Sequence, residues 1–299
     1  MYFPIAEIHA NPYVIFFVAF IVSFFTSMGG VSGAFLLLPF QMSILGYTTP
    51  SVSATNHVFN IVAIPSGVYR YIKEKRMLWP LATAIIIGTL PGVFIGAWVR
   101  IEVLPDPKNF KVFAGFVLLY IGWKLLKDMI SKNRTKKDNG RQINATDFES
   151  LSVMESSFNR VVFTFSGKKY VYTPLTIYII CFIVGIIGGI YGIGGGSIIA
   201  PVLVTIIGLP VHVIAGAALL GTFVTSVSGV IFYQLLAAVY PQVAVSPDWM
   251  LGALFGSGGI LGMYLGARVQ KHVQPVYIKG ILTCCILFIA LKYISGFFI

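Results

Sequence analysis

The sequence predicts an all-α polytopic membrane protein made of two inverted-topology repeats, each with about five hydrophobic segments. Composition, an internal match and the distribution of basic residues lead to this fold class. The 299 residues are 57% hydrophobic and 10% charged, whereas a soluble domain carries about 25% charged residues. The chain has more apolar surface than one soluble core can hide, so we expect the lipid bilayer to solvate it.

Apolar runs recur along the whole chain, and too few polar side chains interrupt them for the alternation of a membrane strand. We therefore expect each run to form a helix. The runs cover about 12–27, 34–46, 51–69, 78–99 and 110–126 in the first half, and 174–190, 197–209, 212–239, 249–267 and 278–298 in the second.

The two halves of the chain repeat each other. Residues 12–71 align without a gap with residues 174–233, at an offset of 162 residues. Eight extra residues before Trp249 raise the offset to 170, and Trp79 then aligns with Trp249. A duplicated unit explains this match. We expect an N-terminal transmembrane repeat at 1–130, a linker at 131–172 and a C-terminal transmembrane repeat at 173–299.

Basic residues indicate how the repeats lie in the membrane, because cytoplasmic connections are enriched in Lys and Arg. In the first half they follow the third and fifth runs. In the second half the pattern is exchanged, since 240–248 has no Lys or Arg and 268–279 has three. We expect an inverted second repeat in the cytoplasmic membrane, with the linker 131–172 in the cytoplasm and both termini outside. The net charge of +11 lies in these connections, so nucleic acid is not an expected partner.

The linker is the one polar stretch of the chain. Residues 160–172 alternate in polarity around Ser166 and Gly167, which predicts a short β-hairpin.

A glycine-rich break separates the first and second apolar runs of each half. At 1.5 Å per residue these runs reach only ~20 to 24 Å into a ~30 Å hydrocarbon layer, and irregular backbone at that depth must face protein or a wet cavity. We expect two glycine-broken helical hairpins that meet near the midplane; whether their helices cross fully or are re-entrant stays open. The break residues are Gly29, Gly30, Ser32 and Gly33 in the first half, and Gly192, Gly194, Gly195, Gly196 and Ser197 in the second.

The chemistry of the breaks favours an anionic ligand. Glycine lets backbone N–H groups approach a ligand, and each break leads into a helix N-terminus, where free N–H groups attract negative charge. No Asp or Glu lies in the middle of a run, although a cation carrier normally keeps one there. The three cysteines match no metal spacing, so we expect no metal or other cofactor. Neutral donors complete the predicted substrate site: Thr55, Asn56, His57 and Asn60 in the first half, with Thr222 and Thr225 in the second.

Some of these signals also have structural interpretations. Glycines in dense breaks can serve helix packing, and we expect that role for two ladders spaced by four residues. His57 either donates to a backbone carbonyl at the outer interface or titrates near neutral pH and couples protons to anion movement. A sodium ion is the other candidate for coupling. The ladders are Gly88, Gly92 and Gly96, and their counterparts Gly258, Gly262 and Gly266.

The breaks resemble the motif of the sulfite exporter TauE/SafE family, a glycine-rich sequence repeated in each half. Here the motifs read GGVSGAFLLLP from Gly29 to Pro39 and GIGGGSIIAP from Gly192 to Pro201. The first departs from the second by having Ser32 where the second has glycine. The resemblance covers both halves and implies a cytoplasmic-membrane transporter of sulfur-containing anions, such as sulfite, sulfonates including sulfoacetate, or thiosulfate.

We therefore predict a secondary membrane transporter rather than an enzyme, with a small anion as its partner. A passive anion channel is the stronger alternative, because antiparallel repeats also build channels. An intramembrane serine hydrolase is the weaker one, since residues 30–33 resemble a Gly-x-Ser-Gly motif and only His57 could activate Ser32. The sequence leaves a homodimer, the direction of transport and the coupling ion open.

Overall fold

The computed structural model describes residues 1–28, 32–73, 77–134, 152–157, 160–165, 167–206, 211–269 and 275–298. The first half holds α1 (Pro12–Met28), α2 (Ala34–Ser43), α3 (Ser51–Ala63), α4 (Pro65–Lys73), α5 (Trp79–Glu102) and α6 (Pro107–Arg134). The second half holds α8 (Pro174–Tyr191), α9 (Gly196–Ile206), α10 (Val211–Val239), α11 (Trp249–Val269) and α12 (Pro275–Phe298). The short strands are β1 (Tyr2–Phe3) and β2 (Ile8–His9) before α1, and β3 (Ser152–Ser156), β4 (Val161–Phe165) and β5 (Lys168–Tyr172) in the linker.

The helices are apolar outside and hold polar side chains inside, the reverse of a soluble protein. Phe17, Ile87 and Phe288 are exposed, whereas Asn56 and Asn60 are fully buried. This distribution suits a hydrocarbon solvent, and the chain is a multi-pass helical membrane protein, as predicted. Four described helical stretches are long and apolar enough to cross a membrane: 79–102, 174–191, 214–239 and 249–266.

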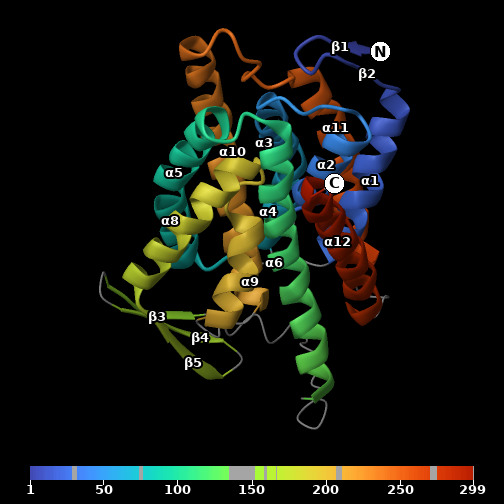
Figure 1. Cartoon of the computed structure of the whole chain (residues 1–299). Helices are drawn as coiled ribbons and strands as arrows, with labels where there is room; N and C mark the ends of the chain where they lie inside the picture. The colour runs from blue at the N-terminus through green and yellow to red at the C-terminus, as the bar shows by residue number, and fades with distance from the viewer. Residues whose placement is uncertain are drawn as a thin grey trace.

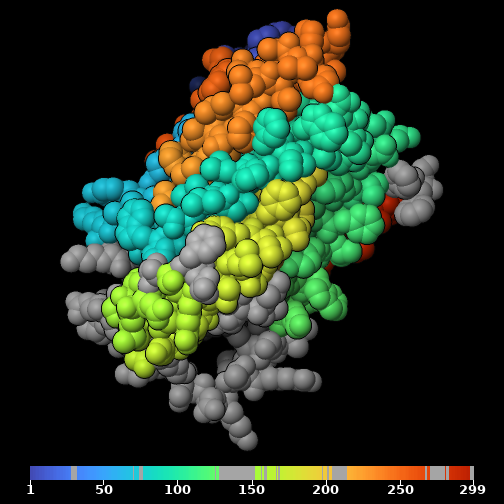
Figure 2. Space-filling model, turned by 90° about the vertical axis from the view of Figure 1, so that its left-hand side faces the viewer, coloured from blue at the N-terminus to red at the C-terminus, as the bar shows by residue number. Residues whose placement is uncertain are grey.

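Long helices of one half pack against long helices of the other. α5 packs against α8, and α1, which aligns with α8, packs against α11, which aligns with α5. Replacing each helix by its aligned counterpart also turns the contact of α5 with α10 into the contact of α11 with α3. α6 packs against α12, the helix with which it aligns. Figure 2 shows α10, α5, α8 and α6 side by side across one face. The two halves are therefore interlocked.

Glycine ladders let these helices touch backbone to backbone. A Cβ on Gly92 would fall on the carbonyl oxygen of Phe182 in α8, and a Cβ on Gly262 would fall on the carbonyl oxygen of Phe20 in α1. Phe20 and Phe182 occupy aligned positions of the two halves, so both crossings use the same contact. The packing role predicted for these glycines is confirmed. The remaining ladder glycines meet the partner helix in the same way: Gly88, Gly96, Gly258 and Gly266.

The third apolar run of the first half is not a single helix. α3 ends at Ala63 and α4 begins at Pro65, whereas the aligned α10 is continuous. Proline has no N–H to donate into the helical ladder, so the ladder is interrupted there. The prediction of one run over 51–69 is corrected by this boundary.

The hairpin in the linker lies where the sequence pattern places it. β4 and β5 pair antiparallel, with Phe165 opposite Lys168. Gly167 in the turn has a φ of 72°, a conformation that glycine adopts without strain. β3 adds a third strand beside β4. Sequence analysis missed the β1–β2 pair, whose strands have only two residues each, and β3, in which Val153 and Met154 interrupt the alternation of polar and apolar residues.

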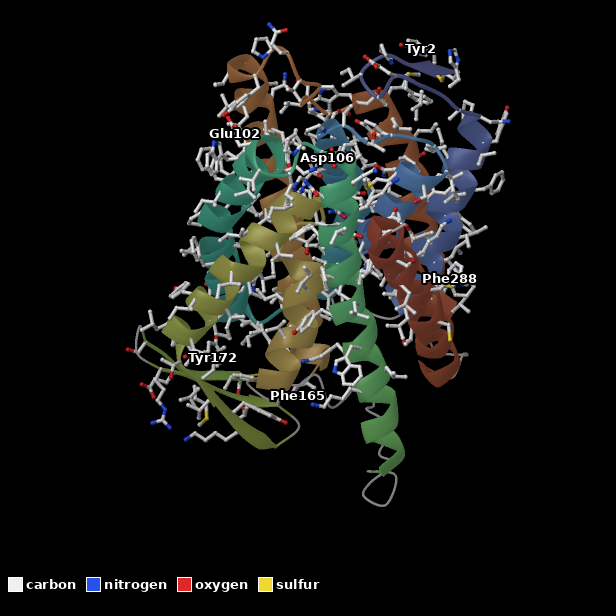
Figure 3. All side chains as sticks on the ribbon, in the orientation of Figure 1. Tyr2, Glu102, Asp106, Phe165, Tyr172 and Phe288 are labelled. Carbon is white, nitrogen blue, oxygen red and sulfur yellow. The ribbon has the colours of Figure 1, made fainter. Side chains whose placement is uncertain are left out.

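The two ends of the molecule are distinct. Tyr2 and Asp106 lie at one end, and Tyr172 lies at the other (Figure 3). Lys292, near the end of α12, lines a small cavity together with Lys108 at the start of α6. In Figure 1 the N-terminus lies at the end opposite β3–β5, and α12 ends on the side that points away from these strands.

Gly262→Ala is expected to destabilise the fold by about 2–3 kcal/mol, because the added methyl group meets the backbone of Phe20. Thermal unfolding of the detergent-solubilised protein measures this effect. Gly296→Ala in α12 is the control, since nothing lies within 4 Å of its added Cβ and alanine is favoured in helices by about 1 kcal/mol. An unchanged melting temperature for Gly262→Ala would contradict the backbone contact.

Candidate functional site

The second break is a tight loop in which the backbone requires glycine. Gly192 closes α8 in the left-handed conformation, with a φ of 76°, and its N–H donates to the carbonyl of Gly188 over 2.9 Å. Gly194 also has a positive φ, 62°, and α9 begins at Gly196. A Cβ on Gly192 would fall on the carbonyl oxygen of Ser53. The loop is therefore pressed against α3.

The first break is described only from Ser32 onward. Gly29 and Gly30, two of the predicted site residues, lie outside the described residues. Ser32 is buried, and its Oγ accepts a hydrogen bond from the N–H of Ala34 over 3.3 Å. Gly33 is the N-cap residue of α2 and packs against α1. Ser32 thus binds the first turn of the helix that follows the break.

Asn60 of α3 joins the two breaks. The hydroxyl of Ser32 donates to Asn60 Oδ1 over 2.6 Å. Asn60 Nδ2 donates to the carbonyl of Ile193 in the second break over 3.1 Å, and to Ser226 Oγ of α10 over 3.2 Å. One amide therefore connects both halves through a buried network. We call Ser32, Asn56, His57, Asn60 and Ser226 the polar cluster.

His57 is fully buried in this cluster. Its Nδ1 lies 3.3 Å from Ser226 Oγ, and its Nε2 has no partner among the described residues. Position 229 must be small here, because a Cβ on Gly229 would lie 2.7 Å from Nε2. The partner of the ring is thus a side-chain hydroxyl, not the backbone carbonyl of the interfacial alternative.

Asn56 fixes the start of α2. Its Nδ2 donates to the carbonyl of Ala34 over 3.0 Å, and its Oδ1 accepts from Gln41 Nε2 at 3.5 Å. The other amide atom of Gln41, Oε1, is buried without a partner among the described residues. Asn56 and Gln41 therefore form the side of the polar cluster that faces α2.

Thr222 and Thr225 of the predicted site use their hydroxyls within α10. Thr222 Oγ1 donates to the carbonyl of Ala218 over 2.8 Å, and Thr225 Oγ1 donates to the carbonyl of Gly221 over 2.7 Å. Thr222 nevertheless lies against the second break, because a Cβ on Gly196 would collide with its hydroxyl.

Thr55 and Ser197 are the remaining predicted residues. Thr55 faces away from the cluster, since its Oγ1 accepts from the N–H of Asp248 over 2.9 Å and lies 2.8 Å from the hydroxyl of Tyr47. Ser197 is in the first turn of α9, and its side chain lies outside the described residues. The structure thus separates Thr55 from its sequence neighbours.

The glycines of the second break face different neighbours. A Cβ on Gly194 would lie 3.0 Å from Ser226 Oγ, inside the cluster, whereas a Cβ on Gly195 would lie 2.7 Å from Thr89 Cγ2 of α5. No backbone hydrogen bond uses the N–H groups of Gly194, Gly195 or Gly196 within the part of the chain that the structure describes. Close packing explains why these positions carry no side chain.

All side-chain partners within the polar cluster are neutral. A neutral set of amide, hydroxyl and imidazole groups can donate hydrogen bonds to an anion without a carboxylate that would repel it. The hydroxyl of Ser32 donates to Asn60, not to His57. The pair of Ser32 with His57 that the serine-hydrolase alternative requires is therefore not formed.

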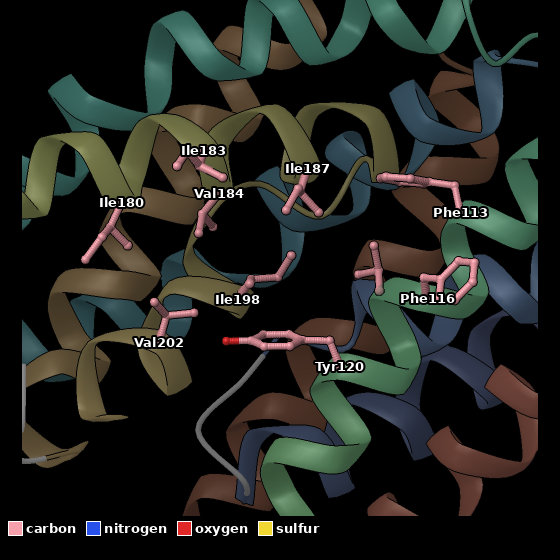
Figure 4. A pocket seen from close by; sticks show the side chains of 10 residues that line it. Phe113, Phe116, Tyr120, Ile180, Ile183, Val184, Ile187, Ile198 and Val202 are labelled. Atoms are coloured by element: carbon pink, nitrogen blue, oxygen red, sulfur yellow. The ribbon is translucent and has the colours of Figure 1, made fainter. Parts of the chain in front are cut away.

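An apolar pocket of about 460 Å³ lies between α6, α8 and α9 (Figure 4). Its walls include Phe113, Tyr120, Ile183 and Val202. These side chains offer an anion almost no hydrogen-bond donors, so this pocket is not the predicted site.

Sequence analysis missed the tyrosines that hold the breaks. Tyr191 donates to the carbonyl of Phe35 over 2.9 Å, and Tyr233 donates to the carbonyl of Gly189 over 2.9 Å. The alignment of Tyr233 with Tyr71 marks the position in both halves. This alignment does not indicate which carbonyl accepts the hydrogen bond from the Tyr233 hydroxyl, because the acceptor belongs to a different helix.

These features define the class: a multi-pass helical membrane protein with a buried, neutral polar cluster between its two halves. The family model for the sulfite exporter TauE/SafE family matches residues 15–293, and the chain belongs to this family.

Two curated relatives match nearly the whole chain. The probable membrane transporter protein YunE of Bacillus subtilis (strain 168) is 24% identical over 277 residues, 90% of this chain and 92% of that protein. The probable membrane transporter protein YjnA of the same strain is 21% identical over 270 residues, with 89% and 92% covered. No solved structure matches the chain significantly.

The bond between Ser32 and Asn60 is expected to give a coupling free energy of about 1 kcal/mol in a double-mutant cycle with Ser32→Ala and Asn60→Ala. The free energy of unfolding in detergent is the measured quantity. Thr83→Ala is the control partner for Ser32→Ala, because the exposed Thr83 bonds only to its own helix. Strictly additive effects of Ser32→Ala and Asn60→Ala would contradict a direct bond between them.

Proposed function

We propose that the protein is a secondary carrier of small sulfur-containing anions in the cell membrane. Sulfite, sulfonates such as sulfoacetate, and thiosulfate are the proposed substrates. Membership of the TauE/SafE family supports transport of this substrate class. The names of the two relatives, both probable membrane transporters, support a transport role.

The proposed mechanism is alternating access by two inverted repeats. Exchange of the repeats interconverts the contacts of α5 with α8 and of α1 with α11, the relation expected for such repeats. The equivalence of the two contacts also holds for individual residues, because Gly92 meets Phe182 and the aligned Gly262 meets the aligned Phe20. In this proposal each repeat begins with a glycine-broken hairpin, and the two hairpins enter from opposite faces.

The proposed orientation puts the linker in the cytoplasm and both termini outside. The N-terminus lies at the end opposite β3–β5, and α12 ends pointing away from these strands (Figure 1), which supports this topology. The basic residues that flank the linker support the assignment of that end to the cytoplasm.

The anion is proposed to bind between the two breaks, and the bridge through Asn60 is the observation that carries this proposal. Among the described residues no backbone hydrogen bond from the N–H groups of Gly194, Gly195 and Gly196 is found. Gly196 begins α9, and a helix N-terminus favours an anion. His57 adds a donor when Ser226 donates to its Nδ1, because the proton of the neutral ring then lies on the unpartnered Nε2.

Coupling by a proton or a sodium ion remains part of the proposal. His57 is the proposed proton carrier, since it is the ionisable side chain of the polar cluster and touches both α3 and α10. Replacement of His57 by glutamine would keep a hydrogen-bond donor at this position but remove the group that can titrate.

Uptake into proteoliposomes tests the proposed function. Sulfite, thiosulfate, sulfate, sulfonates and small carboxylates are compared at two pH values, with protein-free liposomes as the control. We expect saturable uptake and counterflow of the sulfur anions. Single-channel current steps would contradict a carrier and favour the passive channel, and uptake at the protein-free level for every anion would overturn the proposal.

Asn60→Asp is expected to lower sulfonate uptake about tenfold at neutral pH, because the introduced carboxylate repels the anion and loses the donor to Ile193. Uptake should recover partly as the pH falls, since protonation neutralises the introduced group while a sulfonate stays ionised. Asn109→Asp, the same change at an exposed position at the start of α6, serves as the matched control. Equal uptake by both variants would argue against a site at Asn60.

A further inference from the structure

Arg100 is a buried cation with no ionic partner among the described residues. It lies in the last turn of α5 and is completely inaccessible to solvent. No ion pair links it to a described carboxylate, and the buried carboxylate of the same end, Asp248, accepts instead from the N–H groups of Ala6 and Leu251. The apolar run expected over 78–99 ends one position before Arg100, so the burial of this residue is a finding of the structure.

The guanidinium group is only partly satisfied. It donates to the carbonyl oxygens of Leu104 and, over 3.2 Å, Thr48. The ring of Phe110 lies 3.8 Å from its central carbon. Nε is buried without a hydrogen-bond partner. Neutral carbonyls and an aromatic face thus surround a full positive charge.

Such an arrangement is costly without a compensating negative charge. Burying a cation loses its hydration, and neutral dipoles recover only part of that free energy. An ionisable side chain inside a membrane protein therefore marks a functional position. Guanidinium suits an oxyanion in particular, because its N–H groups match the spacing of two oxygens in a sulfonate or a sulfite.

The position of Arg100 connects it with the breaks. Its neighbours Ala97 and Ile101 pack in one cluster with Tyr233, whose hydroxyl donates to the carbonyl of Gly189 at the end of α8. Arg100 is two residues before Glu102, the last residue of α5, and Glu102 lies at the end that bears Asp106 (Figure 3). The residue therefore stands between that end of the molecule and the second break.

The aligned helix α11 has no cation at the position of Arg100. At the offset of 170, Arg100 aligns with Gln270. The basic residue in the last turn of α11 is Arg268, which aligns with Trp98 and is exposed. A role in binding an anion that arrives from one side does not require a counterpart in the other half.

We propose that Arg100 binds the transported anion on the side of the membrane where the N-terminus lies, before the anion reaches the two breaks. This inference rests on the proposed function. The anion supplies the missing negative charge and accepts a hydrogen bond from Nε. The class of ligand is an oxyanion with at least two acceptor oxygens on one centre.

Sulfonate uptake from the N-terminal side of oriented proteoliposomes tests the inference. Arg100→Gln should raise the half-saturating concentration at least about tenfold, the equivalent of a lost charged hydrogen bond. Arg100→Lys keeps the charge and can still bind the carbonyls of Thr48 and Leu104, but it lacks Nε and the planar fork, so a rise of about threefold is expected. Lys108→Gln removes an exposed charge at the same end and should change the value less than about twofold.

The outcomes separate the two levels of the proposal. Wild-type half-saturation in Arg100→Gln, or a lower maximal rate alone, would overturn the role of Arg100 and leave the carrier intact. If Arg100→Gln does not fold, the Arg100→Lys variant decides. Were Arg100 only a cap for the end of α5, the half-saturating sulfonate concentration of Arg100→Lys would equal that of the wild-type protein. Absence of uptake by the wild-type protein would overturn the carrier and the inference together.

Discussion

Backbone that leaves a helix inside a membrane must find its partners within the protein, and the rest of this structure follows from that constraint. At the second break, the carbonyl of Ile193 accepts from Asn60, while Gly192 lies against the carbonyl of Ser53. At the first break, Ser32 and Asn56 bind the start of α2. Side chains of α3 thus do for both breaks what water does for a loop in a soluble protein.

The glycine ladders make this arrangement sterically feasible. Contact between the backbones of α5 and α8, and of α1 and α11, brings the two halves close enough for α3 and α10 to lie between them. Larger residues at Gly92 or Gly262 would separate the helices and withdraw α3 from the breaks. The packing of the periphery and the hydrogen bonds of the centre therefore depend on each other.

The distribution of charge divides the molecule into regions with different tasks. The polar cluster contains no carboxylate among its described hydrogen-bond partners. Arg100, whose guanidinium is buried, lies in the last turn of α5, and that helix ends at Glu102, at the end of the molecule away from β3–β5 (Figure 3). A proposed anion would thus meet a full positive charge first and weaker, neutral donors later. Binding that weakens toward the centre suits a carrier, which must release its substrate.

Much of the fold could be predicted because it is encoded in local patterns. The apolar runs, the duplicated unit and the spacing of the ladder glycines are periodic in the sequence, and the residues at Gly92 and Gly262 behave as the spacing indicates. Contacts between distant segments could not be predicted in the same way. Asn60 and Ile193 are separated by 133 positions, and nothing local says that their side chain and carbonyl meet.

Two residues of the candidate site illustrate the same limit. Thr55 and Asn56 are adjacent polar residues on one helix, yet Thr55 binds the segment before α11 and Asn56 binds α2. The difference depends on which helices flank α3, which the sequence does not state. Arg100 directly follows the apolar run expected over 78–99, and only its contacts with distant segments reveal that it is enclosed.

The central claim is that an anion binds between the two breaks at mid-depth in the membrane. Paired cryo-electron microscopy maps of the protein in lipid nanodiscs, with and without thiosulfate, test it most directly. The account predicts extra density that contacts Asn60 and the N–H groups of Gly194 to Gly196, near the centre of the bilayer. Breaks at the level of the lipid headgroups, or ligand density only at another place, would contradict it.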